Sequence, residues 1–269
     1  MKLKHLPRAL GLPSVVREYP FAVSTCHLPV DGDVQLAVWR HPSERLKTVT
    51  QANVNALRTF LRPGDVAIDI GAHTGDSTVP IALAAGPAGT VYALEPNPYV
   101  FKVLAANAGL NGSKTHIVPL MFAATQEDGD FEFAYSDHGF CNGGASDWLH
   151  RWTNGHFWNL RVAGRNLAAY LQAEAPHDIA RIRYIKLDTE GFDRVVFGTL
   201  AGIVERARPY IKTEIYRHLP EGERLGYYDD LRRAGYRLFL CEDDDRRGAE
   251  VRREAMIERP HFDVFAVPD

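Results

Sequence analysis

A glycine-rich turn between Asp69 and Gly75 is the part of the sequence best suited to bind a ligand. The turn reads DIGAHTG and follows the apolar run 66–70. Glycine lacks a Cβ, so the backbone can bend sharply and approach a ligand closely, and the N-terminus of a following helix offers free N–H groups to a carboxylate. Glu95 ends the next apolar run, where an acidic side chain can bind both hydroxyls of a ribose. The expected ligand therefore carries a ribose and a carboxylate.

A dinucleotide-binding turn is the main alternative interpretation of this segment. Such a turn normally has the spacing G-x-G-x-x-G, which is absent here, and the Tyr-x-x-x-Lys pair of short-chain dehydrogenases is absent as well. A tight strand-to-helix turn without a ligand is the second alternative. Within the turn, His73 either contributes its backbone while its side chain fills space, or it faces the substrate.

Acidic residues follow two further apolar runs. Asp188 and Glu190 come directly after 184–187, Glu214 lies at the end of 210–215, and His218 follows shortly after. Ligands of parallel α/β sheets bind outside the carboxyl ends of the strands, and carboxylates and imidazoles can remove a proton from a substrate. We predict that Asp188, Glu190, Glu214 and His218 form the catalytic site, with the base drawn from the last three.

Two alternatives concern the same side chains. Asp188 and Glu214 can instead hold a Mg²⁺ ion, because hard cations prefer several oxygen ligands. In the structural alternative, some of the acids cap helices or pair with Arg194, Lys212 or Arg217, and Asp188 braces its loop.

Seven short segments are predicted to form the strands that position these residues: 66–70, 90–94, 117–123, 184–187, 210–215, 236–241 and 262–267. The first of them is almost wholly apolar, as a strand buried on both faces should be. Apolar residues at helical spacing predict helices over 50–61, 77–85 and 98–108. Alternating strands and helices indicate a parallel sheet, and a charged, solvated turn over 242–253 makes the final strand antiparallel. We therefore predict an α/β, Rossmann-like class I methyltransferase fold with a mostly parallel seven-stranded sheet and an antiparallel last strand.

Two segments lie outside this repeating pattern. Residues 1–48 are predicted to form an N-terminal extension or cap with a β-hairpin over 27–39, while residues 49–269 form the main domain. An insertion over 126–180 separates the third and fourth strands and begins with a hairpin near 128–135. Its aromatic stretch is predicted to be a lid over the substrate, an apolar clamp onto the core, or the contact of a homodimer. The stretch contains Trp148, Trp152, Phe157 and Trp158, with His138, His150 and His156 nearby.

Charge and cysteine spacing argue against several classes of protein. The 31 basic and 34 acidic residues give a net charge of −3, which provides no general attraction to nucleic acid. Cys26, Cys141 and Cys241 are scattered, so neither a zinc site nor a disulfide framework is expected. No apolar run approaches the roughly 20 residues that span a bilayer, and the N-terminus has no hydrophobic signal core. We therefore predict a cytoplasmic protein that does not bind membranes.

Several segments together resemble the FkbM family of methyltransferases. They are FLRPGDVAIDIGAHTGDST, VYALEPNPYVFKVLAANAGLN and IKLDTEGFDRVVFGTL, and RVAGRNLAAYL is similar to a short element that the family has at the same place. The resemblance runs from about Leu61 to Tyr216. It departs from the family at His73, where asparagine is commoner, and at Phe192-Asp193, which replace a small residue and a glutamate.

The resemblance implies S-adenosylmethionine as cofactor and, usually, O-methylation of a sugar or a natural-product hydroxyl. The expected ribose and carboxylate would then belong to this cofactor. The predicted function is methyl transfer to a hydroxyl of a small acceptor; the alternatives are N- or C-methylation, or a cofactor-binding interaction module that has lost catalysis. The predicted cofactor contacts are Asp69, Gly71, Ala72, His73, Thr74, Gly75, Glu95, Pro96, Asn97 and Ala123.

Overall fold

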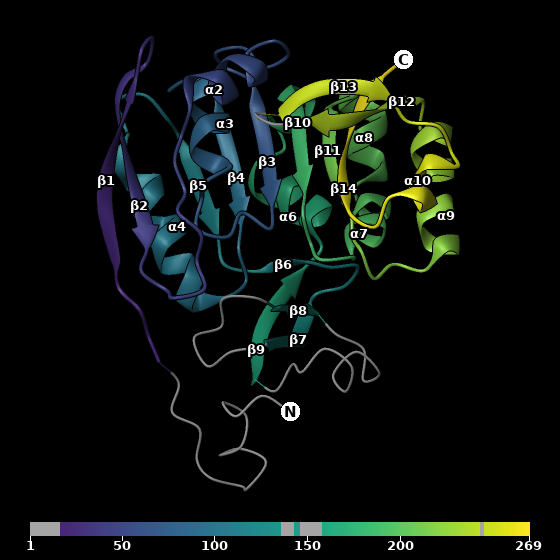
Figure 1. The fold of residues 1–269 in the computed structure, drawn as a ribbon, viewed down its shortest axis with the longest axis horizontal. Helices are drawn as coiled ribbons and strands as arrows, with labels where there is room; N and C mark the ends of the chain where they lie inside the picture. The colour runs from purple at the N-terminus through teal and green to yellow at the C-terminus, as the bar shows by residue number, and fades with distance from the viewer. Residues whose placement is uncertain (1–16, 136–142, 146–157, 243–244) are drawn as a thin grey trace, which may run out of the picture.

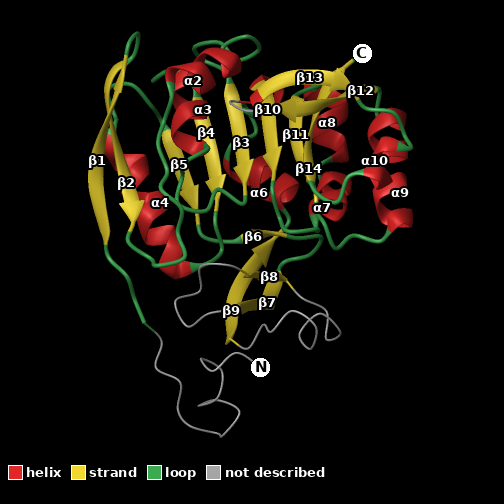
Figure 2. Ribbon diagram, in the orientation of Figure 1, coloured by secondary structure: helices red, strands yellow, loops and turns green. Residues whose placement is uncertain are grey.

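A central sheet with helices on both faces forms the body of the protein (Figures 1 and 2). The structure is a computed structural model that describes residues 17–135, 143–145, 158–242 and 245–269. Within these residues the sheet has eight strands in the order β13-β12-β14-β11-β10-β3-β4-β5. The strands are β3 (Val66–Ile70), β4 (Thr90–Leu94), β5 (Ile117–Leu120), β10 (Ile182–Leu187), β11 (Tyr210–Ile215), β12 (Tyr236–Glu242), β13 (Arg246–Glu250) and β14 (Phe262–Pro268).

The strand directions confirm the predicted Rossmann-like class I methyltransferase fold. Strands β11, β10, β3, β4 and β5 run parallel, and β14 is antiparallel to both β11 and β12. Residues 242–253, predicted to be a charged turn, differ from this prediction. Part of the segment forms β13, an eighth strand that pairs with the edge of β12. Asp245 is also not solvated as predicted. Its carboxylate accepts hydrogen bonds from Asn53 and Lys212 and anchors this segment to the core.

Strand β3 contacts both helical layers because every one of its residues is buried. Val66, Ile68 and Ile70 pack in one core with helices α6 (Leu167–Glu174), α7 (Asp193–Thr199), α8 (Ala201–Ala207) and α9 (Glu221–Arg233). Ala67 points to the opposite face, which is covered by α2 (Gln51–Leu57), α3 (Thr78–Ala85) and α4 (Pro98–Leu110). This alternation explains why the strand reads as a continuous apolar run. A 3₁₀ turn, η2 (Ile179–Arg181), and a short helix, α10 (Ala255–Glu258), complete the described helices.

The predicted N-terminal hairpin is present as β1 (Phe21–Leu28) and β2 (Gly32–Trp39). Asn107 of α4 and Asn111, the residue that caps the C-terminus of α4, bind the edge of β2 that β1 leaves open. Asn107 accepts from the Ala37 N–H at 2.7 Å and donates to the Ala37 carbonyl at 3.0 Å, and Asn111 makes the same pair of bonds to Gln35. Asn107 also donates to the Thr74 carbonyl at 2.7 Å. The hairpin is therefore joined through one buried amide to the glycine-rich turn.

A second, small sheet lies beyond the carboxyl ends of the central strands (Figure 1). It is formed by β6 (Ala123–Ala124), β7 (Gly129–Tyr135), β8 (Gly143–Ala145) and β9 (Trp158–Arg165), in the order β6-β9-β7-β8. The hairpin predicted near 128–135 is instead the single strand β7, whose partners β8 and β9 come from later in the insertion. Of the aromatic stretch only Trp158 is described. Trp148, Trp152, Phe157, His138, His150 and His156 lie outside the described residues.

The helices that the structure describes include none with the length and apolar character needed to cross a membrane.

Replacing Asn107 by alanine should lower the free energy of unfolding by about 1–3 kcal/mol, because a buried backbone N–H and two carbonyls lose their partner. Asn111→Ala is the matched control, since Asn111 makes the equivalent two bonds to the backbone of Gln35 and makes none to the turn. Chemical denaturation of both variants measures the difference. Equal losses would show that the bond to Thr74 contributes nothing.

Candidate active site

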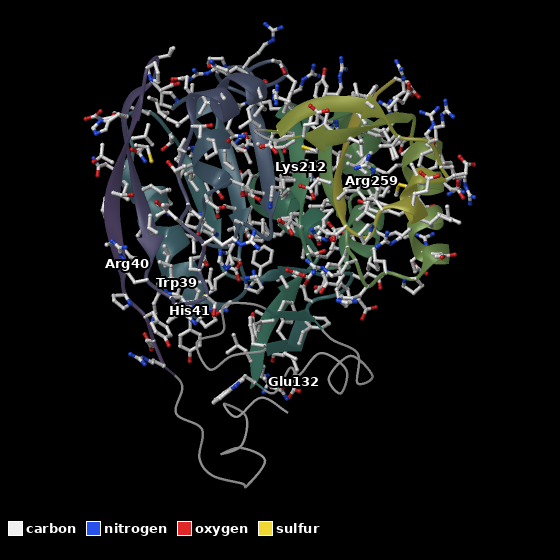
Figure 3. All side chains as sticks on the ribbon, viewed as in Figure 1. Trp39, Arg40, His41, Glu132, Lys212 and Arg259 are labelled. Atoms are coloured by element: carbon white, nitrogen blue, oxygen red, sulfur yellow. The ribbon has the colours of Figure 1, made fainter. Side chains whose placement is uncertain are left out.

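A cavity of approximately 860 Å³ lies between the central sheet and the small sheet. Its walls are the glycine-rich turn, the ends of β4, β10 and β11, strand β7, and the segment 43–47 that follows the hairpin. Polar side chains crowd this region in Figure 3, which labels Trp39, the last residue of β2, and His41 just after it. The Trp39 ring lies 6.2 Å from the ring of His73 in the turn. The cavity therefore occupies the place where α/β folds bind ligands.

The turn is shaped by a close approach between two strand ends. Gly71 has φ of +77°, and a Cβ at this position would lie 1.9 Å from the Asp188 carbonyl oxygen. The N–H groups of Gly71 and Ala72 both donate to the Leu94 carbonyl, at 3.1 and 2.9 Å. Only glycine meets both the positive φ and the contact distance, so the sequence pattern follows from packing as well as from ligand binding.

Asp69 lies beneath the turn and is completely buried. One carboxylate oxygen accepts from the hydroxyls of Ser77 and Thr78, at 2.8 and 2.7 Å, at the start of α3. The other oxygen lies 3.4 Å from the Lys186 ammonium. Asp69 therefore fixes the turn from below and does not form part of the cavity wall.

Glu95 lies at the end of β4 and lines the same cavity. One of its oxygens accepts from the Asn97 N–H at 2.8 Å, while the Asn97 side chain caps α4 by accepting from the Tyr99 N–H. Burial raises the pKa of Glu95 to about 7, although hydrogen bonds from the backbone of Asn97 and His73 oppose this shift. A carboxylate held this way can accept hydrogen bonds from two neighbouring hydroxyls.

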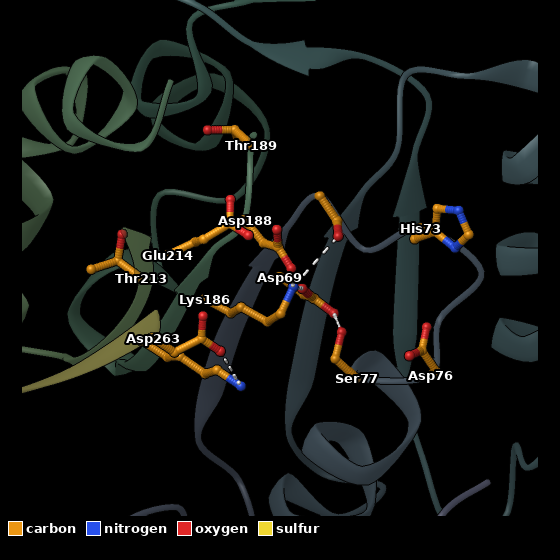
Figure 4. A network of polar contacts seen from close by, with 12 residues as sticks. Asp69, His73, Asp76, Ser77, Lys186, Asp188, Thr189, Thr213, Glu214 and Asp263 are labelled. Carbon is orange, nitrogen blue, oxygen red and sulfur yellow. Dashed lines mark hydrogen bonds and ion pairs between the residues drawn. The ribbon is translucent and has the colours of Figure 1, made fainter. Parts of the chain in front are cut away.

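The structure brings Asp188, Glu190 and Glu214 to one wall of the cavity, as predicted. Figure 4 shows Asp188 and Glu214 next to each other. Glu214 is 9% exposed, and within the described residues its Oε2 atom has no hydrogen-bond partner. Burial, together with the charges of Asp188 and Glu190, raises the pKa of Glu214 to about 9. A carboxyl with this pKa is a stronger base than an ordinary glutamate once it is ionised.

Asp188 differs from its neighbours because it has a cation beside it. Lys186 lies between Asp69 and Asp188 (Figure 4), and its ammonium donates to Asp188 at 3.1 Å. Burial alone would raise the pKa of Asp188, but the Lys186 ammonium outweighs burial and holds it below the ordinary value. Asp188 is therefore an ionised carboxylate with its own counterion, as the bracing alternative predicts.

Glu190 has an uncommon backbone conformation. Its φ is +55°, and Gly191 follows with φ of +105°. Non-glycine residues in this region store conformational strain, which persists only where the surroundings enforce it. The Tyr216 hydroxyl donates to Glu190, and burial followed by the charge of Asp188 raises the pKa of the Glu190 carboxyl. The turn thus holds Glu190 at the cavity wall.

Asp193, at the site of a departure from the FkbM pattern, has a structural role. It is fully buried and accepts from the Thr189 N–H at 3.3 Å, from the Thr189 hydroxyl at 2.9 Å and from the Thr213 hydroxyl at 3.2 Å. Burial raises its pKa to about 6. Asp193 closes the loop that carries Glu190.

The structure does not bring His218 to the cavity. Its side chain is exposed, packs edge-on against Tyr216 with ring centroids 5.3 Å apart, and is not part of the wall. His261 lies closer to the acids, with its Nε2 atom 3.4 Å from Glu214 Oε1. No sequence pattern indicated His261, because this residue precedes the last strand and reaches Glu214 only through the pairing of β14 with β11.

The predicted cofactor residues divide into two groups. Gly71, Ala72, His73, Glu95, Pro96 and Ala123 line the cavity, whereas Asp69, Thr74, Gly75 and Asn97 lie behind its wall. The sequence missed Glu44 and Lys47 in the segment before α2, and it did not connect the aromatic residues of β7 with the site. Phe131, Phe133 and Tyr135 all line the cavity, and their two-residue spacing is the signal that could have indicated a common face.

The suggested Mg²⁺ site is not supported. Among the residues that the structure describes, no three His, Cys, Asp or Glu side chains are grouped so as to hold a metal ion. The place beside Asp188 where a cation would bind is taken by the Lys186 ammonium. The predicted alternative partners of the acids are also engaged elsewhere, since Lys212 pairs with Asp245 and Asp263, and Arg194 pairs with Glu223 and Asp230.

The strand order, the glycine-rich turn and the acid at the end of β4 together define a Rossmann-like methyltransferase. Residues 69–238, more than half of the 269-residue chain, match the family model described as the methyltransferase FkbM domain. The chain therefore belongs to the FkbM methyltransferase family.

Solved structures with similar folds are distant in sequence. An FkbM methyltransferase from Methylobacillus flagellatus is 13% identical with a TM-score of 0.46, covering 79% of this chain and 50% of its own. An S-adenosylmethionine-dependent O-methyltransferase from Thermotoga maritima is 13% identical with a TM-score of 0.42 (91% and 77%). Precorrin-6y C5,15-methyltransferase from Geobacter metallireducens is 12% identical with a TM-score of 0.42 (84% and 94%). No curated protein matches the sequence.

The raised pKa of Glu214 should make the folded state less stable as the pH rises. In the unfolded chain a glutamate ionises near its ordinary value of 4.5, whereas folded Glu214 keeps its proton up to about pH 9. The folded state binds more protons in this window, so the stabilising contribution is complete below pH 4.5 and is lost as the pH rises toward 9. Glu214→Gln lacks this titration and should become progressively more stable than the wild type between pH 5 and 9.

Thermal unfolding of the two proteins across this range measures the effect, and Glu258→Gln at an exposed position is the control. Parallel pH profiles for the wild type and Glu214→Gln would contradict the assignment.

Proposed function

We propose that the protein transfers the methyl group of S-adenosylmethionine to a hydroxyl of a small acceptor. The observation that carries this proposal is Glu214. It is a buried carboxyl whose Oε2 atom has no partner among the described residues, and it lines the same cavity as the glycine-rich turn and Glu95. A group that can take a proton and a site suited to a nucleoside cofactor thus share one enclosed space.

The residues that line the cavity would hold the cofactor as follows. Glu95 would bind the ribose hydroxyls, and the turn at Gly71 and Ala72 would face the amino-acid portion. Pro96 and Ala123 would contact the adenine. When bound, S-adenosylmethionine supplies a methyl group that is open to attack by an oxygen nucleophile.

The chain must align the acceptor hydroxyl and remove its proton. Alignment can supply about 7–11 kcal/mol of the barrier. A free alkoxide at pH 7 would cost about 12 kcal/mol, if the hydroxyl has a pKa near that of water, roughly 16. Glu214 lowers this cost, because a carboxyl with a pKa of about 9 ionises at pH 7 for only about 3 kcal/mol. The carboxylate then accepts the proton on Oε2 as the carbon–oxygen bond forms and the carbon–sulfur bond breaks. Glu190, which lines the same cavity, would orient the same hydroxyl by a hydrogen bond.

The body of the acceptor would lie between aromatic surfaces. Phe131, Phe133 and Tyr135 of β7 form one wall, and Phe192 and Val195 at the start of α7 form another. Phe192 and Val195 are exposed despite their apolar side chains. Aromatic faces suit the C–H surface of a sugar or a polyketide ring. This wall supports a saccharide or natural-product acceptor, which needs no basic surface of the kind that binds nucleic acid.

Titration with S-adenosylhomocysteine tests the cofactor half of the proposal. We expect the wild type to bind it and Glu95→Ala to lose about tenfold or more in affinity, because two hydrogen bonds to a carboxylate are removed. Isothermal calorimetry measures both. Glu132→Ala, at an exposed position on β7, is the control. Folded wild-type protein without affinity for this ligand would refute the proposal.

Transfer of a tritiated methyl group to a panel of hydroxylated saccharides and polyketides tests the reaction. Glu214→Gln should lower kcat by about 10²–10⁴-fold, the usual contribution of a general base, while leaving S-adenosylhomocysteine affinity unchanged. The wild-type kcat/KM should rise with pH toward 9, as the Glu214 carboxyl ionises, and this rise should be absent in the variant. Activity should survive dialysis against EDTA.

If the tritiated methyl group were found on nitrogen or carbon instead of oxygen, the protein would be an N- or C-methyltransferase. Cofactor binding without transfer to any acceptor would favour an interaction module.

A further inference from the structure

The segment Ser43–Lys47 contributes a charged group to the cofactor side of the cavity, although it lies before the methyltransferase domain in the sequence. The segment connects β2 with α2, and Ser43, Glu44, Arg45 and Lys47 all line the cavity. None of these residues falls within the matched family segment, which begins at residue 69. These residues are distant from the glycine-rich turn in the sequence, and only the tertiary structure brings them close to it.

Lys47 makes its contacts with the glycine-rich turn. Its ammonium lies 2.9 Å from His73 Nδ1, donates to the Thr74 hydroxyl at 3.1 Å, and pairs with Asp76 Oδ1 at 2.8 Å. Two residues of the turn and Asp76, which follows it directly, thus contact one lysine that is distant in sequence. The Lys47 side chain is 20% exposed, so it is enclosed by the site and still faces the cavity.

Glu44 completes the cluster from the same segment. Its Oε1 atom lies 2.8 Å from the Lys47 ammonium, and the Glu44 side chain is 5% exposed. Asp76 is 35% exposed on the other side of the lysine. One ammonium therefore lies between two carboxylates at the cavity wall, and the cluster offers both a positive and a negative partner at adjacent positions.

This arrangement of charges is complementary to an α-amino acid, which carries a carboxylate and an ammonium on one carbon. We propose that Lys47 binds the carboxylate of the cofactor's methionine portion, while Glu44 and Asp76 bind its α-ammonium. The inference rests on the proposed cofactor and extends it to residues outside the family segment. It assigns to the N-terminal segment a direct part in cofactor binding.

Burial opposes a charged lysine, but the carboxylates of Asp76 and Glu44 outweigh it and raise the pKa of Lys47 above the ordinary value. The ammonium is therefore kept through the whole range in which binding can be measured. A charged hydrogen bond in a partly enclosed site is worth more than one in water, so its removal should be visible in the affinity.

Two ligands distinguish a direct contact of Lys47 with the amino-acid portion from an indirect effect of Lys47 on the shape of the turn. S-Adenosylhomocysteine carries the whole amino-acid portion, whereas 5′-methylthioadenosine has the same nucleoside and sulfur without it. Lys47→Met should bind S-adenosylhomocysteine about tenfold or more weakly than the wild type, since it loses a charged hydrogen bond. Its affinity for 5′-methylthioadenosine should stay within about twofold of the wild type. Lys47→Arg should restore part of the lost affinity.

Lys114→Met is the matched control. Lys114 also lies near the hairpin, donates to the carbonyls of Asp31 and Asp33, and does not line the cavity. The Lys114→Met variant should bind both ligands with the affinity of the wild type. Calorimetry with each folded variant gives all the affinities, and Glu44→Gln tests the second half of the cluster by the same comparison should Lys47→Met fail to fold.

Removing the carboxylate from the ligand, and measuring its affinity for the wild type, tests the same interaction independently. Decarboxylated S-adenosylhomocysteine keeps the amine and lacks the carboxylate, so the wild type should bind it about as weakly as Lys47→Met binds the complete ligand. The two losses should not add in Lys47→Met, because they remove the same interaction.

Three results would overturn the inference. They are unchanged S-adenosylhomocysteine affinity in Lys47→Met, an equal loss of affinity for both nucleosides, and losses that add fully with the decarboxylated ligand. If the wild type bound neither nucleoside, the proposed cofactor itself would be wrong and this assignment would fall with it.

Discussion

The site depends on the contact between the glycine-rich turn and the end of the neighbouring strand. The Asp188 carbonyl lies where a Cβ of Gly71 would be, and the Asp188 N–H donates to the Ile70 carbonyl at 3.1 Å. These two contacts lock the end of β3 against the end of β10. Because one strand end carries the glycine-rich turn and the other carries the acids, the distance between them is set by backbone packing and not by side-chain rotamers.

A buried lysine divides the acids of the site into two kinds. Lys186 lies between Asp69 and Asp188 and holds the pKa of Asp188 below the ordinary value, whereas burial raises the pKa values of Glu214 and Glu190. Like charges close together cannot all ionise at neutral pH. The compensated acids hold the turn and the strand ends in place, and the uncompensated acids are available for proton transfer.

The two appendages of the core form opposite walls of the cavity. The hairpin is attached to α4 through the side-chain amides of Asn107 and Asn111, and it delivers the segment with Lys47 to the turn. On the other side, the insertion folds back through the pairing of β6 with β9 and places β7 over the strand ends. The FkbM segment thus supplies the cofactor turn and the acids, while both walls come from chain that flanks or interrupts it.

Features that depend on local physics could be predicted from the sequence. Strands buried on both faces read as short, mostly apolar segments, so β3 and β4 were predicted with their observed bounds, and the mixed segment 210–215 matches β11 as well. The turn at Gly71, the acid at Glu95 and the acids at the ends of β10 and β11 followed from position along those strands. Only the tertiary structure decided which charges meet. Lys47 and His261 reach the site through pairings between distant segments, and the part of the chain beyond a strand end has no periodicity to fix its direction, so His218 turned away. Charge pairing is set by three-dimensional distance, which no short-range pattern records.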